Sequence, residues 1–253
     1  MRRASGLLCF YILALTACGG GPGGSTTTKK EDAARYNVQL GLAYLQKGEL
    51  ALAKEKLERA EKQNPRDPQL QSSLGMLYER LGEPQQADRY YRQALRMAPD
   101  DPEVQNNYAI YLCRQKRVDE GVEKFMLAAS NPLYRTPEAA LTNAGVCLRE
   151  AKRFDEAAAR FTRALAVRPN FSEAAYQLGD LELERGRNAE AKAVVTRYLD
   201  AFRPTPDVLL LAVRVSRASN DRLAEERYAR RLRVDFPESP QARALGSLPD
   251  RKP

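Results

Sequence analysis

Cysteine is the residue type through which this chain could carry covalent chemistry. The 253-residue sequence contains Cys9, Cys18, Cys113 and Cys147, and it contains no histidine. Without histidine, Ser-His and Cys-His nucleophilic sites and histidine-ligated metal sites are excluded. The cysteines also form no CxxC pair of the kind that marks most zinc sites. An enzyme would then need a carboxylate pair or a Ser-Lys dyad, and no spacing in the sequence indicates either. We therefore expect no enzyme activity, no metal and no cofactor, which leaves lipid attachment and disulfide formation as roles for cysteine.

Cys18 follows a segment with the features of a bacterial export signal. Two arginines come directly after the first methionine, and residues 4–15 form an apolar run that is too short to cross a bilayer as a helix. The sequence LTAC at residues 15–18 then resembles the lipobox of bacterial lipoproteins, in which a peptidase cuts before a cysteine that carries diacylglycerol. This resemblance implies a lipoprotein signal peptide over residues 1–17 and acyl chains such as palmitate on Cys18. The alternative is an ordinary signal peptide with a chance cysteine.

The residue after Cys18 bears on which membrane receives the anchor. By resemblance to lipoproteins of Gram-negative bacteria, Gly19 in place of aspartate favours the outer membrane, with the folded part facing the periplasm. Acyl chains contribute about 0.8 kcal/mol per buried methylene, so two or three of them anchor a protein firmly. Residues 19–30 are rich in glycine, serine and threonine. We therefore expect residues 18–32 to be a lipidated end with a flexible tether.

The rest of the chain repeats with a period of 34 residues, except for a step of 36 between the third and fourth units. Small residues and prolines recur in four sets. The sets are Gly41, Gly75, Ala109, Gly145 and Gly179; Ala53, Ala87, Gly121, Ala157 and Ala191; Ala60, Ala94, Ala128 and Ala164; and Pro65, Pro99, Pro169 and Pro237. Such self-similarity indicates a protein built from stacked units.

These positions are similar to the consensus of the tetratricopeptide repeat (TPR), a pair of helices joined by a tight turn. Small residues let the two helices approach, and proline ends the second helix. The resemblance implies an all-α fold, a right-handed superhelix of about six TPR units over residues 33–240. The units are expected at about 34–67, 68–101, 102–137, 138–171, 172–205 and 206–239. Asp67, Asp101 and Thr136, each followed by proline, predict helix starts. Residues 241–253 are expected to be a loose tail without a separate capping helix.

A TPR superhelix has a concave groove lined mainly by the first helix of each unit, and the resemblance implies binding of a protein rather than catalysis. The partner-binding candidates along these helices are Val38, Leu42, Leu45, Ser72, Met76, Asn106, Ile110, Thr142, Arg149 and Tyr176. The first unit is apolar at its three positions, which indicates either a binding surface or packing on the next helix. Asn106 has mediocre helix propensity, so it is either a donor to a partner's backbone or a solvated side chain.

The formal net charge of +8 raises the question of nucleic acid binding. The basic residues are spread among acidic ones along the predicted helices, as in residues 54–62, a pattern typical of solvated helix surface. Together with the export signal, this pattern argues against a nucleic acid partner. No spacing of residues indicates a small-molecule substrate.

The most specific sequence lies in the third and fourth units. Residues 106–113 read NNYAIYLC, and residues 131–147 contain NPLYRTP followed by NAGVC. With the lipobox and six TPR units, this sequence resembles the type IV pilus biogenesis and stability lipoproteins of the PilF/PilW group, although Ala109 and Tyr111 stand where that group often has glycine and phenylalanine. The resemblance implies an outer-membrane pilotin that binds the pilus secretin and promotes its localisation and multimerisation. Some members of the group affect pilus stability instead, and the motif does not distinguish the two roles. The alternative is a periplasmic TPR lipoprotein that acts as a scaffold or regulator of peptidoglycan enzymes.

Cys113 and Cys147 fall on the first helices of neighbouring predicted units. Such helices pack at roughly 8–10 Å, and the thiols of exported proteins become oxidised in the periplasm. We therefore predict a Cys113–Cys147 disulfide. The alternative is two separate buried thiols.

Overall fold

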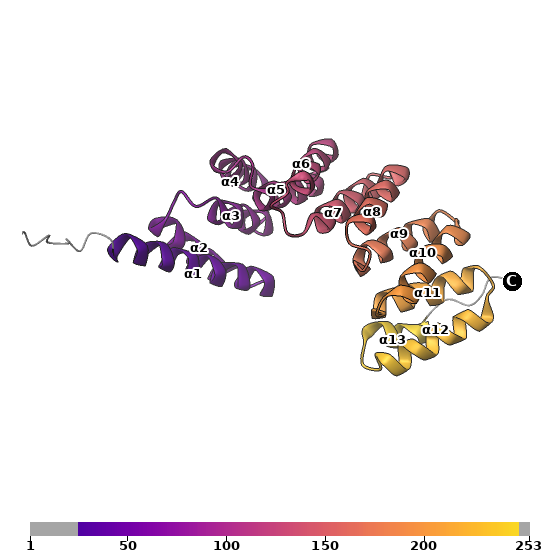
Figure 1. The fold of residues 1–253 in the computed structure, drawn as a ribbon. Helices are drawn as coiled ribbons and strands as arrows, with labels where there is room; N and C mark the ends of the chain where they lie inside the picture. The colour runs from indigo at the N-terminus through magenta and orange to yellow at the C-terminus, as the bar shows by residue number, and fades with distance from the viewer. Residues whose placement is uncertain (1–24, 248–253) are drawn as a thin grey trace, which may run out of the picture.

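In the computed structural model, which describes residues 25–247, the chain is a series of helices joined by short turns (Figure 1). The helices are α1 (Ser25–Lys47), α2 (Leu50–Gln63), α3 (Pro68–Arg80), α4 (Pro84–Met97), α5 (Pro102–Arg114), α6 (Val118–Ser130), α7 (Pro137–Glu150), α8 (Phe154–Val167), α9 (Ser172–Glu184), α10 (Asn188–Ala201), α11 (Pro206–Ala218), α12 (Arg222–Asp235) and α13 (Pro240–Ala244), followed by the 3-10 turn η1 (Leu245–Ser247). Within residues 25–247 there is no strand.

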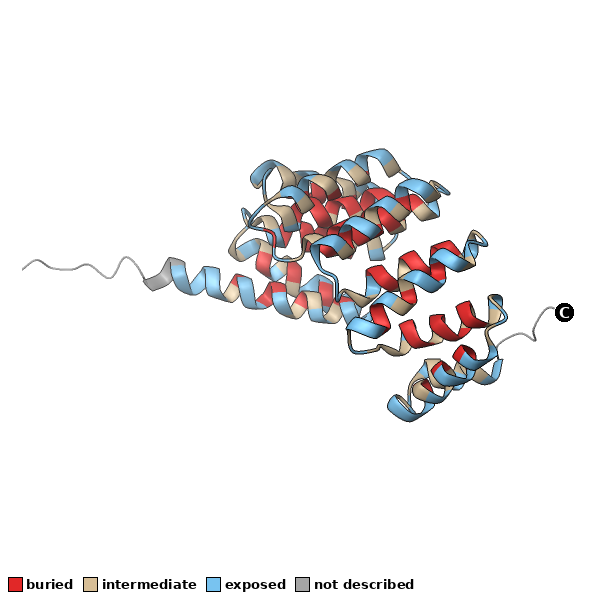
Figure 2. Cartoon of the chain, turned by 45° about the vertical axis from the view of Figure 1, so that its right-hand side comes forward, coloured by how far each residue is buried: buried red, intermediate tan, exposed pale blue. Residues whose placement is uncertain are grey.

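The helices α1 to α12 pair into six hairpins, and the hairpins stack into an arch (Figure 1). The first helix of each hairpin packs both on its own partner and on the first helix of the next hairpin. Buried residues lie where helices face one another, while exposed residues cover the outer surface (Figure 2). Each hairpin therefore closes the apolar face that its neighbour leaves open, and the all-α TPR architecture expected from the sequence is confirmed.

One residue in the left-handed backbone region makes the tight turn inside each hairpin. These residues are Gly48, Gly82, Lys116, Lys152, Gly186 and Asn220, with φ between 54° and 76°. They follow the same spacing as the other repeated positions. Glycine adopts this conformation without a Cβ clash, whereas lysine and asparagine hold it at a cost. The turn geometry is thus kept in all six hairpins even where glycine is lost.

Glycines in the first helices allow close contact with large side chains of the second helices. A Cβ at position 41 would lie 2.6 Å from Cγ of Leu57, and one at position 75 would lie 2.9 Å from the ring of Tyr91. Real Cβ atoms are not found at such distances from carbon. Gly41 and Gly75 are therefore explained by packing within their hairpins rather than by backbone conformation.

The predicted helix starts at Asp67 and Asp101 are confirmed. Oδ1 of Asp67 accepts hydrogen bonds from the N–H groups of Gln69 and Leu70, at 2.8 and 3.4 Å, and Asp101 caps α5 in the same way. Thr136 also precedes its helix, α7, but its side chain makes no capping hydrogen bond. Its ψ of 53° is far from the extended backbone of the two aspartates, so the hydroxyl is turned away from the free N–H groups.

Two boundary expectations were wrong. Residues 25–32 belong to α1 and not to a flexible tether, because they contain no proline or glycine that would stop the helix from extending outward from its packed part. Residues 241–247 are not loose. Ser239 caps α13, and Leu245 packs against the core formed by α9 to α12. This short segment covers apolar surface of the sixth hairpin.

The predicted signal peptide, Cys18 and residues 248–253 lie outside the described residues. Of the helices between residues 25 and 247, none has the length and apolar character that crossing a membrane requires.

Candidate functional site

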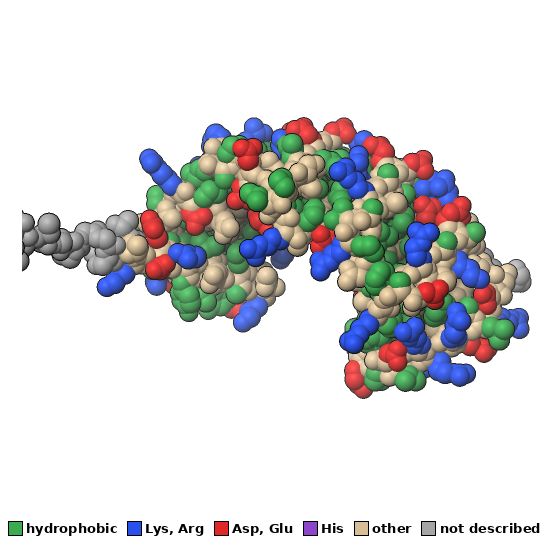
Figure 3. Space-filling view, viewed as in Figure 1, with side chains coloured by type: hydrophobic (Ala, Val, Ile, Leu, Met, Phe, Trp, Pro, Cys, Tyr) green, Lys and Arg blue, Asp and Glu red, His purple; other side chains and the backbone are tan. Residues whose placement is uncertain are grey.

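The first helices of the six hairpins each place one side chain at an equivalent position, and together these form what we call the concave column. Its members are Leu42, Met76, Ile110, Val146, Asp180 and Arg214. All six are partly exposed. Figure 3 shows the molecule hollowed on the lower side of the arch, between the first and last helices. The column is apolar over its first four members and charged over the last two.

Leu42, Met76 and Ile110 line a cavity of about 180 Å³ between α1, α3 and α5. Leu45 and Tyr91 complete the apolar wall. The polar residues at this cavity are Gln46, Glu79, Arg80, Asn107 and Arg114. Four of the ten residues predicted to bind a partner therefore meet in one hollow, which has an apolar floor and a polar rim.

Glu79 organises part of that rim. Nη1 of Arg114 donates to Oε1 of Glu79 at 3.1 Å, and the hydroxyl of Tyr91 donates to Oε2 at 3.5 Å. Burial, reinforced by the Glu79 carboxylate, raises the pKa of Tyr91 well above its usual value. The tyrosine therefore stays neutral and acts as a donor, so the floor of the cavity remains uncharged.

Four other predicted groove residues are buried and do not face the hollow, so this part of the prediction was wrong. Val38 packs in the core of the first two hairpins, and Ser72 is 2% exposed. Thr142 donates its hydroxyl hydrogen to the Glu138 carbonyl at 2.8 Å, and Asn106 accepts from Nδ2 of Asn143 at 3.4 Å. The first helices are covered by neighbouring helices on several sides. Adjacent residues on a helix point in different directions, so one can face the groove while the next lies in a helix interface.

Amide side chains at the neighbouring positions of the first helices were not predicted, and one of them, Asn107, lines the cavity. Gln39, Asn107, Asn143 and Gln177 each come one residue after a predicted position, and all four are at least partly exposed. The signal was present in the sequence, because an amide recurs with the repeat spacing in each of the first five hairpins except the second, which has Ser73. Amide side chains supply both a donor and an acceptor, which suits them to contact the backbone of a bound segment.

The charged half of the concave column is held by ion pairs. Nη2 of Arg149 lies 2.8 Å from Oδ2 of Asp180 and 2.6 Å from Oε2 of Glu184, while Nη1 of Arg214 lies 2.7 Å from Oδ1 of Asp180. Arg149 also donates to Gln177 at 3.1 Å. This predicted residue therefore ties α7 to α9, and Asp180 continues the chain of contacts to α11.

Tyr176 is partly exposed on α9, one turn before Asp180. Its pKa is raised, first by burial and then by the Asp180 carboxylate. Tyr176 thus offers a neutral hydroxyl beside the ion pairs, at the position in α9 that corresponds to buried Thr142 in α7.

Cys113 and Cys147 are joined by a disulfide, with their Cα atoms 5.7 Å apart. The bond connects α5 to α7 and spans the step of 36 residues between the third and fourth hairpins. Tyr134, in the connection between α6 and α7, packs in the same core. The disulfide therefore fixes the third and fourth hairpins relative to each other.

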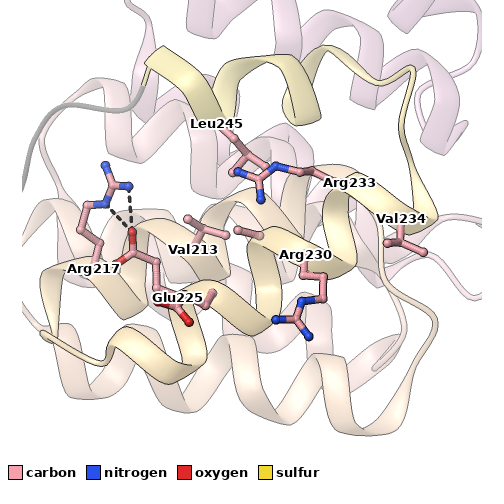
Figure 4. Close-up of a pocket in the computed structure, with 9 residues that line it drawn as sticks. Val213, Arg217, Glu225, Arg230, Arg233, Val234 and Leu245 are labelled. Carbon is pink, nitrogen blue, oxygen red and sulfur yellow. Dashed lines mark hydrogen bonds and ion pairs between the residues drawn. The ribbon is translucent and has the colours of Figure 1, made fainter.

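Another cavity, of about 470 Å³, lies at the end of the arch between α11, α12 and η1 (Figure 4). Nε and Nη2 of Arg217 both donate to Oε1 of Glu225, at 2.9 and 2.8 Å. Arg230 and Arg233 extend from α12, and Leu245 closes one side. None of these residues was singled out from the sequence.

Comparison with known families identifies the repeats directly. Two tetratricopeptide repeat families match the chain, one over residues 38–87 and 73–139 and the other over residues 148–214. The matches fall on the hairpins that carry the concave column.

Comparison with known proteins relates the whole arch to pilus proteins. The type IV pilus assembly protein PilF of Pseudomonas aeruginosa is 27% identical over 209 residues, which cover 83% of both chains. The crystal structure of PilW, described as a widely conserved type IV pilus biogenesis factor, is 28% identical and covers 84% of this chain and 97% of its own, with a TM-score of 0.65. The structure of P. aeruginosa PilF is 26% identical and covers 87% and 99%, again with a TM-score of 0.65. The chain is therefore a tetratricopeptide repeat protein homologous to the type IV pilus biogenesis proteins PilF and PilW.

Proposed function

We propose that this chain is a lipid-anchored assembly factor for type IV pili. In this proposal the concave groove binds a subunit of the pilus secretin, and acyl chains on Cys18 direct the complex to the outer membrane, where the secretin multimerises. The homology to PilF and PilW supports a role in pilus biogenesis, and a TPR fold supports a role in protein binding rather than in catalysis.

The observation that carries the proposal is the cavity under Leu42, Met76 and Ile110. Partly exposed apolar side chains in a concave surface gain free energy when a partner covers them, at about 25 cal/mol per Å² of apolar surface removed from water. The amide of Asn107 stands beside this floor, where it suits the backbone of an extended segment. The groove thus fits a short stretch of a partner that presents apolar side chains.

The short connection to the proposed anchor would keep this groove near the membrane. Six residues separate Cys18 from Ser25, the first residue of α1. An extended chain spans at most about 3.5 Å per residue, so the first turn of α1 would lie within roughly 25 Å of the lipid attachment. A partner bound in the groove would then travel with the anchor.

Gene deletion with complementation tests the proposal. Loss of the gene should abolish the heat-stable secretin multimers detected by immunoblotting, and the unaltered gene should restore them. A Cys18→Ala variant should fold normally but leave secretin multimers away from the outer membrane in fractionated cells. Normal multimers in the deletion strain would contradict the assembly role. Normal multimers in the outer membrane with Cys18→Ala would contradict the lipid-dependent part alone.

A further inference from the structure

A large apolar cavity lies between second helices, away from the concave column. It has a volume of about 590 Å³ and lies between α8 and α10, over α9. Ala175 and Leu178 of α9 form its floor, and its walls include Leu165, Val194 and Phe202. Cavities of this size with mostly apolar walls are typical binding sites.

The apolar character of this cavity comes from two positions that are charged in the preceding hairpin. Val194 and Phe202 of the fifth hairpin correspond, 34 residues earlier, to Arg160 and Arg168. Nη1 of Arg168 lies 2.6 Å from Oε1 of Glu138, so that arginine takes part in an ion pair. Between α8 and α10, apolar side chains replace the two arginines and leave an open groove.

Two charged residues border the groove without an internal partner. Glu190 and Arg197 are exposed lining residues on α10, and neither makes an ion pair or side-chain hydrogen bond with the part of the chain that the structure describes. The equivalent of Glu190 in α8 is Glu156, which is bound by Arg153 at 2.7 and 2.8 Å. Arg187, which corresponds to Arg153, instead has its Nη1 3.6 Å from Oε2 of Glu182. The rim of this groove therefore offers an unpaired acid and an unpaired base.

The spacing of these charges and the small residues on the walls suit one kind of occupant. Seven residues along a helix are about two turns, or roughly 10 Å. The walls include the small side chains of Ala166 on α8 and of Ala193 and Ala201 on α10, so the backbone of a bound helix can approach closely. We propose that this groove docks an amphipathic helix of a partner protein, with an apolar stripe against the floor and a base and an acid two turns apart that face Glu190 and Arg197. The site is separate from the concave groove and does not depend on the proposed role in secretin assembly.

A synthetic helix is the probe for this site. We would use an acetylated and amidated peptide of about 15 residues, with leucines at i, i+4 and i+7 and with a lysine and a glutamate seven positions apart beside that stripe. Titration of the full mature chain, followed by fluorescence anisotropy, should show saturable binding. A scrambled peptide of the same composition should bind at least about tenfold more weakly, a difference worth 1.4 kcal/mol.

Variants of the protein locate the binding. Val194→Arg copies the residue of the preceding hairpin and should weaken the peptide at least about tenfold, whereas Ala159→Arg, on α8 outside the cavity lining, should leave binding unchanged. Arg197→Glu should weaken the original peptide and should regain affinity when the glutamate of the peptide is replaced by lysine. Circular dichroism checks that each variant keeps its helix content.

Three outcomes would overturn the proposal. The first is a lack of saturable binding, and the second is equal binding of the scrambled peptide, which would indicate nonspecific hydrophobic binding. The third is unchanged affinity with Val194→Arg, which would place the peptide elsewhere on the arch.

Discussion

Gly121 of α6 lies directly against the disulfide sulfur of Cys113 on α5. A Cβ at position 121 would be 2.5 Å from that sulfur and 3.1 Å from the carbonyl oxygen of Ala109. The second and fourth hairpins have glycine in the first helix and alanine in the second, whereas the third hairpin has Ala109 and Gly121. In the third hairpin the residue without a Cβ therefore lies on the second helix instead of the first, and this leaves space for the disulfide.

Replacing Gly121 with alanine should therefore strain the third hairpin. Because the added methyl group meets backbone and a cross-linked sulfur, neither of which can move far, we expect a loss of about 1–3 kcal/mol in unfolding free energy. Urea denaturation measures this loss. Gly246→Ala is the matched control, since a Cβ there meets nothing within 4 Å. Equal stability of the two variants would show that the contact is not restrictive.

The disulfide itself should contribute substantially to stability. Replacing Cys113 and Cys147 together with alanine should lower the unfolding free energy by about 2–4 kcal/mol, because the bridge constrains a loop of 34 residues in the unfolded chain. Thermal denaturation of the double variant checks the value. Mass spectrometry after alkylation checks the bond in the native protein, which should add label at these positions only after reduction. Labelling without a reductant would contradict the bridge.

The hairpin turns give a prediction in which gaining a glycine at one turn stabilises the fold and losing a glycine at an equivalent turn destabilises it. Lys152 has φ of 61° in the turn between α7 and α8, and Gly82 has φ of 75° in the equivalent turn between α3 and α4. Lys152→Gly should therefore gain about 0.5–1 kcal/mol, and Gly82→Ala should lose about 1 kcal/mol. At roughly 2–4 °C per kcal/mol for a chain of this size, calorimetry resolves both. A loss of stability with Lys152→Gly would contradict backbone strain at that turn.

Much of the architecture could be predicted because repeat spacing is a property of the sequence alone. The spacing of residues such as Gly41 and Pro65 predicts the helix pairs, and Asp67 predicts a helix start. Neither prediction requires the tertiary contacts to be known. The groove was harder to predict, since Met76 and Ile110 face it while Ser72 and Asn106 do not. Spacing along one helix does not reveal how far the neighbouring helices wrap around it. The five-residue helix α13 was missed because so short a segment has no amphipathic period to detect.

Three tyrosines predict how stability depends on pH. Tyr91, Tyr108 and Tyr111 pack together, with ring centres 5.0 to 6.2 Å apart, and burial raises the pKa of each above its usual value near 10. The folded state therefore holds them neutral, while the unfolded state releases protons above about pH 10. Stability should be at its full value below that pH and should fall as pH rises through the folded-state pKa values.

Parallel titrations of tyrosinate absorbance and circular dichroism test this pH dependence. Part of the tyrosinate signal should appear together with loss of helix at alkaline pH, and Tyr91→Phe should reduce the steepness of the loss. Full tyrosine titration with the helix content intact would show that the cluster is not protected by the fold.

The affinity of the full mature chain for the periplasmic part of the pilus secretin tests the central claim most directly. Met76 lies in the concave groove, and Met97 lies at the end of α4 with 36% of its surface exposed. Met76→Glu places a charge on the apolar floor, so the dissociation constant should rise at least about tenfold, equivalent to 1.4 kcal/mol. Met97→Glu makes the same chemical change outside the cavity and should leave the constant unaltered. Equal affinities for both variants and the original chain, with circular dichroism showing all three folded, would contradict docking in the concave groove.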